Sequence, residues 1–317
     1  MLILRRSAVR YASEILIALS FATLTAGSAG DGSRPDSGTT SAGTSRSWVR
    51  SWGAAMMAPE EFDYYPDLGR SFDDVTLRQI VFPTLAGRSL RVLISNEYGT
   101  QALELGEAHV ATVDHAATIV SASDRPLLFR GRPGTVLPAG ATIFSDPVEL
   151  PITPGIALAV SIYLPHSTAH STSTVHEEGW RLGYVSGRGN HCADAAFPVA
   201  TELGSYFYVA AVDVTAGAGA GAIVALGDSI TDGTGSTPHA GRTWPDDLVQ
   251  RLAMAMPMPG RLAVINMGIG GNRLLYRSIG PSALLRADRD ALAVPGARYL
   301  LILEGINDIA GWPGHPE

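Results

Sequence analysis

Three short apolar runs in the last third of the chain each lead directly into a polar turn that contains glycine. The runs lie at residues 223–226, 262–265 and 299–303, and helical patterns at 244–255 and 281–292 lie between them. A continuous apolar run is typical of a strand buried on both faces of a parallel sheet. The alternation of strands and helices therefore predicts the start of a doubly wound parallel α/β sheet over residues 222–317.

The part of the chain before this sheet has a different pattern. Short runs rich in β-branched and aromatic residues are separated by turns that contain Gly and Pro. Many short strands with frequent turns predict a β-sandwich or jelly-roll-like domain over residues 48–215. The small-residue segment 216–222 (AGAGAGA) marks the predicted domain boundary.

The first 47 residues indicate an exported protein. Arginines at positions 5, 6 and 10 precede an apolar run and then small residues, which predicts a cleaved signal peptide over residues 1–29. The apolar run is shorter than the ~20 residues needed to span a bilayer, so we expect a secreted protein with no stable membrane anchor. Residues 30–47 are mostly Gly, Ser, Thr and Asp and predict a flexible linker.

The charged residues and the cysteine exclude several functions. Every one of the 23 basic residues is arginine, which excludes a lysine Schiff base and a P-loop lysine. The net charge of -7 argues against nucleic acid as a partner. The single cysteine, Cys192, excludes an intramolecular disulfide and a Cys-rich zinc site, and we expect it to be a small buried side chain.

A metal site is the other chemistry that the histidines could indicate. His166, His170 and His176 lie in a segment rich in Ser and Thr, and their spacing fits no helix face. We interpret this segment as a solvated loop. No metal and no organic cofactor is expected.

The three polar turns contain the residue types that acyl transfer requires. Ser229 lies in the first turn, Gly271 in the second and Asn307 in the third. The carboxyl ends of parallel strands meet at one edge of a sheet, so these residues are expected to converge. A serine hydroxyl can act as a nucleophile, and a glycine N–H with an asparagine amide can bind an oxyanion. Ordinary βα turns are the alternative, but three of them in order favour a site.

From about residue 223 the chain resembles the SGNH (GDSL) hydrolases, a superfamily of esterases and lipases. Gly-Asp-Ser-Ile at 227–230 matches the first block of the superfamily, 266–271 matches the second, and Gly-Ile-Asn-Asp at 305–308 matches the third. The resemblance implies that Ser229 is the nucleophile, with its N–H as a further donor, and that Gly271 and Asn307 form the oxyanion hole. The β-rich part resembles, less specifically, an accessory domain of some secreted bacterial members.

The fourth block of the superfamily, Asp-x-x-His, has no match in this chain. It supplies the general base, yet the two histidines after Ser229, His239 and His315, have no aspartate three residues before them. We therefore expect the SGNH-type sheet to be incomplete at the C-terminus. We also expect the chain as it stands to be inactive, because the base histidine is absent from it.

Two functions are compatible with these features. The first is a secreted serine esterase that cleaves carboxylic esters through an acyl-enzyme, acting on a small-molecule or polysaccharide ester, with acetylated polysaccharide preferred. The second is a carbohydrate-binding or surface-interaction protein with a vestigial hydrolase domain, suggested by four aromatic residues, Trp180, Tyr184, Tyr206 and Tyr208. Packing in the core would explain these four residues equally well.

Two aspartates near the predicted nucleophile allow a further interpretation. Asp228 and Asp232 could form a carboxylate pair for phosphoryl or glycosyl chemistry. We favour local hydrogen bonding within the turn for both residues.

Overall fold

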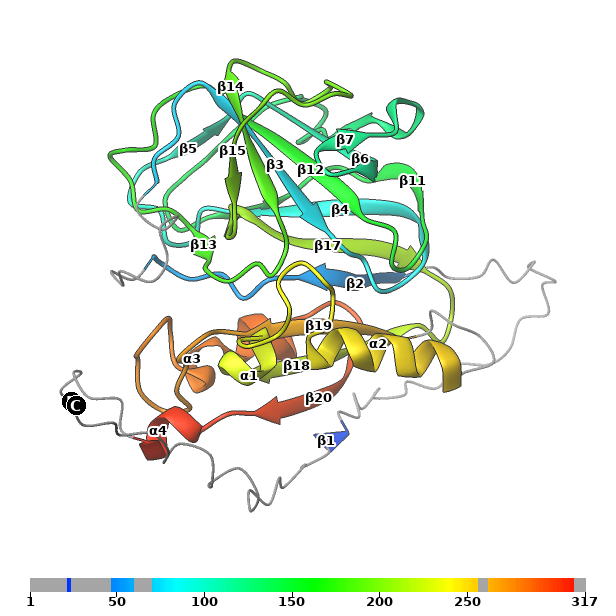
Figure 1. The fold of residues 1–317 in the computed structure, drawn as a ribbon, viewed down its shortest axis with the longest axis vertical. Helices are drawn as coiled ribbons and strands as arrows, with labels where there is room; N and C mark the ends of the chain where they lie inside the picture. Colours follow the sequence, from blue (N-terminus) through cyan, green and yellow to red (C-terminus); the bar gives the residue numbers. More distant parts are fainter. Residues whose placement is uncertain (1–21, 24–46, 60–69, 256–261, 311–317) are drawn as a thin grey trace, which may run out of the picture.

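The computed structural model describes residues 22–23, 47–59, 70–255 and 262–310, which form a β-rich part and a smaller part with parallel strands and helices (Figure 1). The predicted signal peptide and linker lie outside the described residues, apart from β1 (Ala22–Thr23) and the first residue of β2. Both therefore stay predictions. Among the helices of the described residues, none is long and apolar enough to cross a membrane.

Two antiparallel sheets make up most of the β-rich part. The first has the strand order β10-β4-β17-β2, with β11 also paired to β4. Its strands are β2 (Ser47–Gly53), β4 (Gly87–Ser95), β10 (Thr142–Phe144), β11 (Val148–Ile152) and β17 (Val209–Ala216). The second has the order β15-β14-β3-β12-β6-β7, with β8 also paired to β6. Its strands are β3 (Val75–Val81), β6 (Glu107–His115), β7 (Thr118–Ile119), β8 (Arg125–Pro126), β12 (Leu158–Leu164), β14 (Gly183–Arg188) and β15 (Val199–Leu203).

Short elements complete this part of the chain. They are the pair β5 (Leu103–Leu105) and β9 (Thr135–Leu137), the pair β13 (Val175–His176) and β16 (Tyr206–Phe207), and the 3-10 turn η1 (Ser121–Ser123). Successive side chains of a strand point to opposite faces of its sheet, and one face of each sheet points inward. In β4, for example, Leu90, Val92 and Ile94 are buried while Arg91 and Leu93 are partly exposed. Apolar side chains of both sheets meet in one core, as in a β-sandwich, so the prediction of a β-rich front part is confirmed.

Three parallel strands form the centre of the smaller part. The central strand β18 (Gly221–Gly227) pairs in parallel with β19 (Leu262–Gly268) on one side and with β20 (Ala297–Leu303) on the other. The far edge of β20 pairs with β1 in antiparallel orientation. These are the three strands that the apolar runs predict. The chain as a whole is β-rich with mainly antiparallel sheets, so the doubly wound sheet, expected to be incomplete, stays a prediction.

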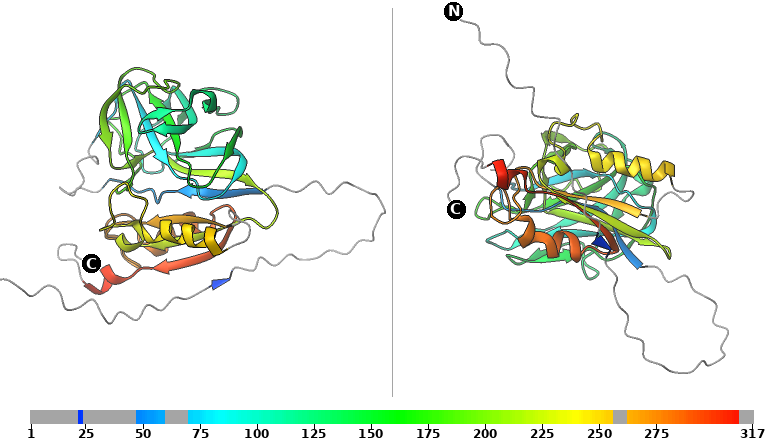
Figure 2. Two further views of the ribbon diagram at one scale, coloured as in Figure 1. Left: turned by 45° about the vertical axis from the view of Figure 1, so that its right-hand side comes forward. Right: turned by 90° about the horizontal axis from the view of Figure 1, so that it is seen from below.

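Helices follow each of these strands. They are α1 (Ser229–Asp232), α2 (Trp244–Ala255), α3 (Ala283–Ala287), the π-helical turn η2 (Asp288–Leu292) and α4 (Ile306–Ala310). Figure 2 shows α2 and α3 on opposite sides of the three parallel strands. Pro245 stands in the first turn of α2, where its missing N–H costs nothing. The Ser282 side chain caps α3 by accepting the N–H of Leu285.

The two parts of the chain meet along β2. This strand pairs with β17 and packs against β19 (Figure 1). The Arg50 N–H donates to the carbonyl of Pro295 at 2.8 Å. The hydroxyl of Thr84 lies 3.2 Å from the carbonyl and 3.1 Å from the N–H of Val264. One hydrophobic core runs across the predicted boundary at 216–222, and the division of the chain into two domains there stays a prediction.

Several large apolar side chains of α3, β20 and α4 face solvent. Leu285 is 75% exposed, Ile302 is 51% exposed and Ile309 is 85% exposed. Leu284, Leu292 and Tyr299 are also exposed. Large apolar side chains are therefore exposed on each of these elements.

Candidate active site

The carboxyl ends of β18, β19 and β20 lie at one level of the sheet. Gly227, the last residue of β18, is in register with Gly268 of β19 and with Leu303 of β20. The three polar turns that follow therefore start side by side. The structure brings together the segments that carry Ser229, Gly271 and Asn307, as the sequence predicts.

Ser229 is the first residue of α1 and is partly exposed. The residue before it, Asp228, is buried, and its carboxylate accepts the N–H of Ile230 at 2.9 Å. This hydrogen bond caps the short helix and holds the turn, so the prediction of local hydrogen bonding is confirmed for Asp228. Burial raises the pKa of the Asp228 carboxyl above its ordinary value.

Gly271 has a backbone conformation that favours glycine, and a side chain there would require Ile279 to move. Its φ is 68°, in the left-handed region. A Cβ at this position would lie 2.6 Å from Cδ1 of Ile279. Because glycine has no side chain, the N–H of Gly271 at the end of the second turn can approach a bound oxygen closely.

Asn307 lies in α4 and connects the third turn to the second. Its Nδ2 donates to the backbone carbonyl of Asn272 at 2.8 Å. The neighbouring Asp308 carboxylate accepts the N–H of Leu274 at 2.8 Å and that of Leu275 at 3.3 Å. An asparagine amide has two N–H donors, so one of them is left for a bound oxyanion.

A general base for Ser229 is not seen among the described residues, none of which hydrogen-bonds its hydroxyl. His239 lies in a loop with φ of 61°, and its N–H donates to the carbonyl of Trp180. His315 lies outside the described residues. The expectation that the chain lacks its base stays a prediction.

The structure corrects the interpretation of His176 as part of a solvated loop. His176 lies in β13, is 7% exposed, and its Nδ1–H donates to the carbonyl of Ala55 at 3.1 Å. Its Nε2 lies 3.3 Å from Oδ1 of Asp232. Burial opposes protonation of the imidazole, but the Asp232 charge, the hydrogen bonds to Asp232 and Ala55 and the charge of Glu177 together outweigh it and raise the pKa of His176. The error arose because the polar sequence around His176 gave no sign of its distant partner.

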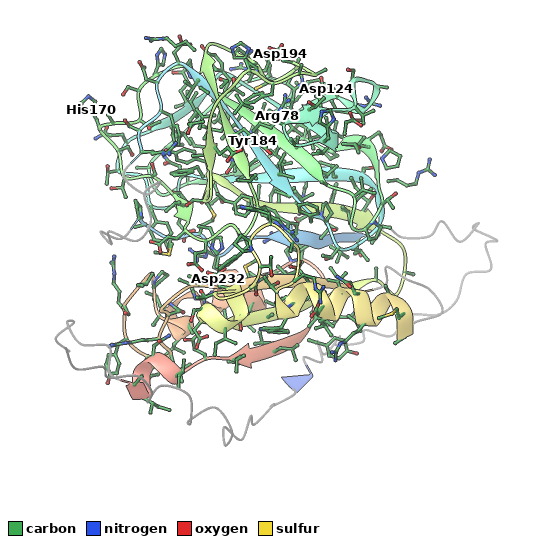
Figure 3. The ribbon with its side chains drawn as sticks, viewed as in Figure 1. Arg78, Asp124, His170, Tyr184, Asp194 and Asp232 are labelled. Atoms are coloured by element: carbon green, nitrogen blue, oxygen red, sulfur yellow. The ribbon has the colours of Figure 1, made fainter. Side chains whose placement is uncertain are left out.

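The turn interpretation is also wrong for Asp232. Its Oδ1 faces His176, and its Oδ2 accepts the N–H of Gly270 in the second turn at 3.1 Å. The Asn266 side chain donates to the backbone carbonyl of Asp232 at 3.1 Å. Asp232 therefore connects the helix that begins with Ser229 to the second turn and to the β-rich part. Figure 3 places it at the level where the two parts of the chain meet.

The other two histidines of that segment behave as expected. His166 and His170 are exposed, and His170 lies at the periphery of the molecule (Figure 3). Within the described ranges, no group of three or more His, Cys, Asp or Glu side chains is arranged to hold a metal ion. Cys192 is buried, as predicted, and burial raises the pKa of its thiol.

The aromatic residues that suggested a sugar-binding surface are mainly core residues. Tyr184, Tyr206 and Tyr208 are 6%, 5% and 1% exposed, so their rings offer no free face for a sugar. Trp180 is partly exposed and borders an open hollow between the 177–182, 202–205 and 238–239 segments. The prediction of a sugar platform is therefore wrong for the three tyrosines.

Two buried residues beside the turns were missed at the level of sequence. The Glu304 carboxyl, at the start of the third turn, is fully buried, and burial raises its pKa to about 8. Arg286 of α3 is fully buried and lies between the strand ends. Charged residues are rarely fully buried, so nothing in the sequence pattern indicates a buried position for either residue.

Comparison with known proteins supports the assignment of the three motifs. Residues 225–317 match the model of the GDSL-like lipase/acylhydrolase family, which confirms the resemblance inferred from the sequence. No curated protein matches the chain.

Solved structures show weaker similarities. A family two carbohydrate esterase from Cellvibrio japonicus is 15% identical, with 86% of this chain and 70% of that chain covered and a TM-score of 0.22. The corresponding enzyme from Clostridium thermocellum, in complex with cellohexaose, is 14% identical, with coverages of 81% and 67% and a TM-score of 0.23. A carbohydrate esterase family 2 enzyme from Corynascus thermopiles (Myceliophthora fergusii) is 13% identical, with coverages of 86% and 68% and a TM-score of 0.23. The fold assignment rests on the sheet topology and not on these similarities.

Proposed function

We propose that this chain, whose residues 225–317 match the GDSL-like lipase/acylhydrolases, is a serine esterase that cleaves carboxylic esters through an acyl-enzyme. The observation that carries the proposal is the common level of the three strand ends, from which the turns with Ser229, Gly271 and Asn307 begin. A hydroxyl, a backbone donor and an amide donor at one sheet edge suit acyl transfer.

The chemistry follows from these three groups. The Oγ of Ser229 attacks the ester carbonyl carbon, and the carbonyl oxygen becomes an oxyanion. The N–H of Gly271, the amide of Asn307 and the N–H of Ser229 donate hydrogen bonds to that oxyanion. Collapse of the intermediate expels the alcohol and leaves an acyl group on Ser229, which water then removes as the acid.

Proton transfer is the step for which the described residues offer no group. The resemblance implies a histidine that takes the proton from Ser229 and returns it to the leaving alcohol.

The substrate we propose is an acetylated polysaccharide, acted on outside the cell. The predicted export signal and the family match support this choice. Release of acetate from acetylated xylan, compared with release of p-nitrophenol from p-nitrophenyl acetate, tests it. No acetate from xylan with measurable p-nitrophenol release would restrict the enzyme to small esters.

Kinetics of three variants of the full-length protein test the proposed function. Asn307→Ala removes one oxyanion donor and should lower kcat by about 10²–10³-fold. Ser229→Ala should abolish turnover that depends on the acyl-enzyme. Ser236→Ala, which alters a partly buried serine seven residues after the proposed nucleophile, is the matched control and should leave kcat unchanged. Equal turnover by Ser229→Ala and the unaltered chain would refute the proposal.

A further inference from the structure

Arg286 connects the ends of two strands of the parallel sheet. It lies in α3, after the second turn, and its side chain is fully buried. One end of its guanidinium, Nη2, donates to the carbonyl of Gly227 at 2.9 Å. The other, Nη1, donates to the carbonyl of Met267 at 2.6 Å. One rigid, planar group therefore fixes the spacing of β18 and β19 directly before their turns.

The same side chain reaches the third turn through Asn272. Arg286 Nε donates to Oδ1 of Asn272 at 3.0 Å. The amide nitrogen of Asn272 donates to the carbonyls of Ile279 and Pro281, at 2.9 and 2.8 Å. The backbone carbonyl of Asn272 accepts the Asn307 amide. A continuous chain of hydrogen bonds thus runs from Arg286 to Asn307.

Two buried carboxyl groups flank the guanidinium. Asp290 Oδ2 lies 3.1 Å from Nη1 of Arg286, and Glu304 Oε2 lies 3.9 Å from Nη2. Glu304 is the residue at which the third turn leaves β20, so the arginine contacts or faces a group at each of the three strand ends.

A purely structural role is a poor explanation for this arrangement. Removing a guanidinium from water is costly, and apolar side chains of similar volume often stabilise a core as well or better. Three hydrogen bonds of Arg286 go to Gly227, Met267 and Asn272, which lie at the ends of β18 and β19 or in the second turn. A fourth pairs Nη1 with Asp290. Groups that act together in acyl transfer need this precision, since small displacements reduce the rate strongly.

We propose that Arg286 is a positioning residue for the three turns of the candidate active site. Its hydrogen bonds place the strand end before Ser229, the second turn with Gly271 and, through Asn272, the amide of Asn307 in one arrangement. It touches neither the substrate nor the reacting atoms. This inference rests on the proposed esterase function.

Arg289, one helical turn away, provides a matched control. It is partly buried, with its side chain 30% exposed, and binds the same carboxylate, with Nε 2.6 Å from Oδ1 of Asp290. Its remaining donors point to the β-rich part, to the carbonyl of Met56 and the hydroxyl of Tyr98, both at 2.8 Å. Arg289→Lys therefore perturbs a neighbouring arginine and its pairing with Asp290 without changing a contact to the three turns.

Steady-state kinetics of Arg286→Lys and Arg289→Lys in the full-length protein test the proposal. Lysine keeps the charge but cannot direct donors to both strand ends and to Asn272. We expect Arg286→Lys to lower kcat by about 10²-fold, as a misplacement of about 1 Å does, with KM changed less than about twofold. Arg289→Lys should leave both constants unchanged. An unchanged kcat in Arg286→Lys would overturn the inference.

Hydrogen exchange of the same variants gives a result that does not depend on turnover. Arg286→Lys should raise amide exchange in segments 227–233, 268–272 and 304–308, and Arg289→Lys should not. Uniformly raised exchange in Arg286→Lys would show a merely structural role and overturn the inference. If the unaltered chain and Ser229→Ala turn over esters equally, the esterase proposal fails and the exchange pattern alone decides the role of Arg286.

Discussion

His176 and Asp232 form a buried pair that joins the two parts of the chain three residues after the candidate nucleophile. Nε2 of His176 lies 3.3 Å from Oδ1 of Asp232, and the two side chains are 9% and 3% exposed. The Nδ1 of His176 must carry a proton, because the Ala55 carbonyl that it faces can only accept. A second proton on Nε2 lets the ring donate to the carboxylate as well, which explains why its pKa is raised.

Replacing this histidine is expected to be strongly destabilising. His176→Gln leaves the Asp232 carboxylate buried without its cationic partner, and removing one member of a buried pair costs about 3–5 kcal/mol. His191→Gln is the matched control, since His191 pairs with Asp194 at 2.7 Å at the surface. It should cost at most about 1 kcal/mol. Chemical unfolding of both variants measures the difference, and equal losses would contradict this account of the pair.

The pair also predicts a pH dependence of stability. The folded pKa of His176 lies above the ordinary value of 6.5, so the folded state holds a proton that the unfolded chain releases. The stabilisation is fully present below pH 6.5 and is lost as the pH rises through the folded pKa. Thermal unfolding between pH 5 and 9 should show this decline in the unaltered chain. The decline should be smaller in His176→Gln, and an identical pH profile of the two proteins would rule out the charged pair.

The Glu304 carboxyl should also make the free energy of unfolding fall as the pH rises. Its carboxyl ionises near 4.5 in the unfolded chain and near 8 in the folded protein. Between these pH values the folded state binds more protons, so the free energy of unfolding falls as the pH rises. Glu304→Gln should therefore be more stable than the unaltered chain at pH 8, by about 1 kcal/mol or more, since one pKa unit corresponds to about 1.4 kcal/mol.

A surface glutamate provides the control for this prediction. Glu202 is exposed, and Glu202→Gln should leave the free energy of unfolding at pH 8 unchanged. At pH 4, where both states hold the Glu304 proton, Glu304→Gln and the unaltered chain should have similar stability. A destabilised Glu304→Gln at pH 8 would show that the carboxylate form is needed for folding.

The strands and the three candidate site residues could be predicted from the sequence, whereas the buried ion pairs could not. The apolar runs predicted β18, β19 and β20 because a doubly buried strand leaves a local signature. The positions of Ser229, Gly271 and Asn307 followed because parallel strand ends meet at one edge. The partners of His176, Asp232 and Arg286 could not be predicted, because each pairing depends on how distant segments pack. A charged side chain in a polar or amphipathic stretch is also expected to be exposed to solvent.

Gly271→Ala should damage the second turn more than the same change at a comparable glycine. Gly131 of the β-rich part has φ of 77°, close to the 68° of Gly271, but no atom lies within 4 Å of its added Cβ. Gly131→Ala should lower the free energy of unfolding by only about 1–2 kcal/mol, the cost of holding alanine in a left-handed backbone conformation. Gly271→Ala adds the clash with Ile279 and should lose more, as urea unfolding can measure. Equal costs would show that Ile279 moves aside freely.

The exposed apolar surface of α3, β20 and α4 predicts self-association. Burying such a surface between two copies removes it from water. Leu285→Glu places a charge where the leucine is 75% exposed and should shift the protein toward the monomer in sedimentation experiments. Val136→Glu, at a valine that is 58% exposed on the β-rich part, should leave association unchanged. Equal association of all three proteins would exclude this surface as the contact.

Identification of the acylated residue tests directly whether Ser229 is the nucleophile. The protein is incubated with p-nitrophenyl acetate, quenched in acid and digested, and its peptides are examined by mass spectrometry. The account predicts a single acetyl group on Ser229, present in the unaltered chain and in Ser236→Ala and lost in Ser229→Ala. An acetyl group on another residue, or ester hydrolysis that persists unchanged in Ser229→Ala, would contradict it.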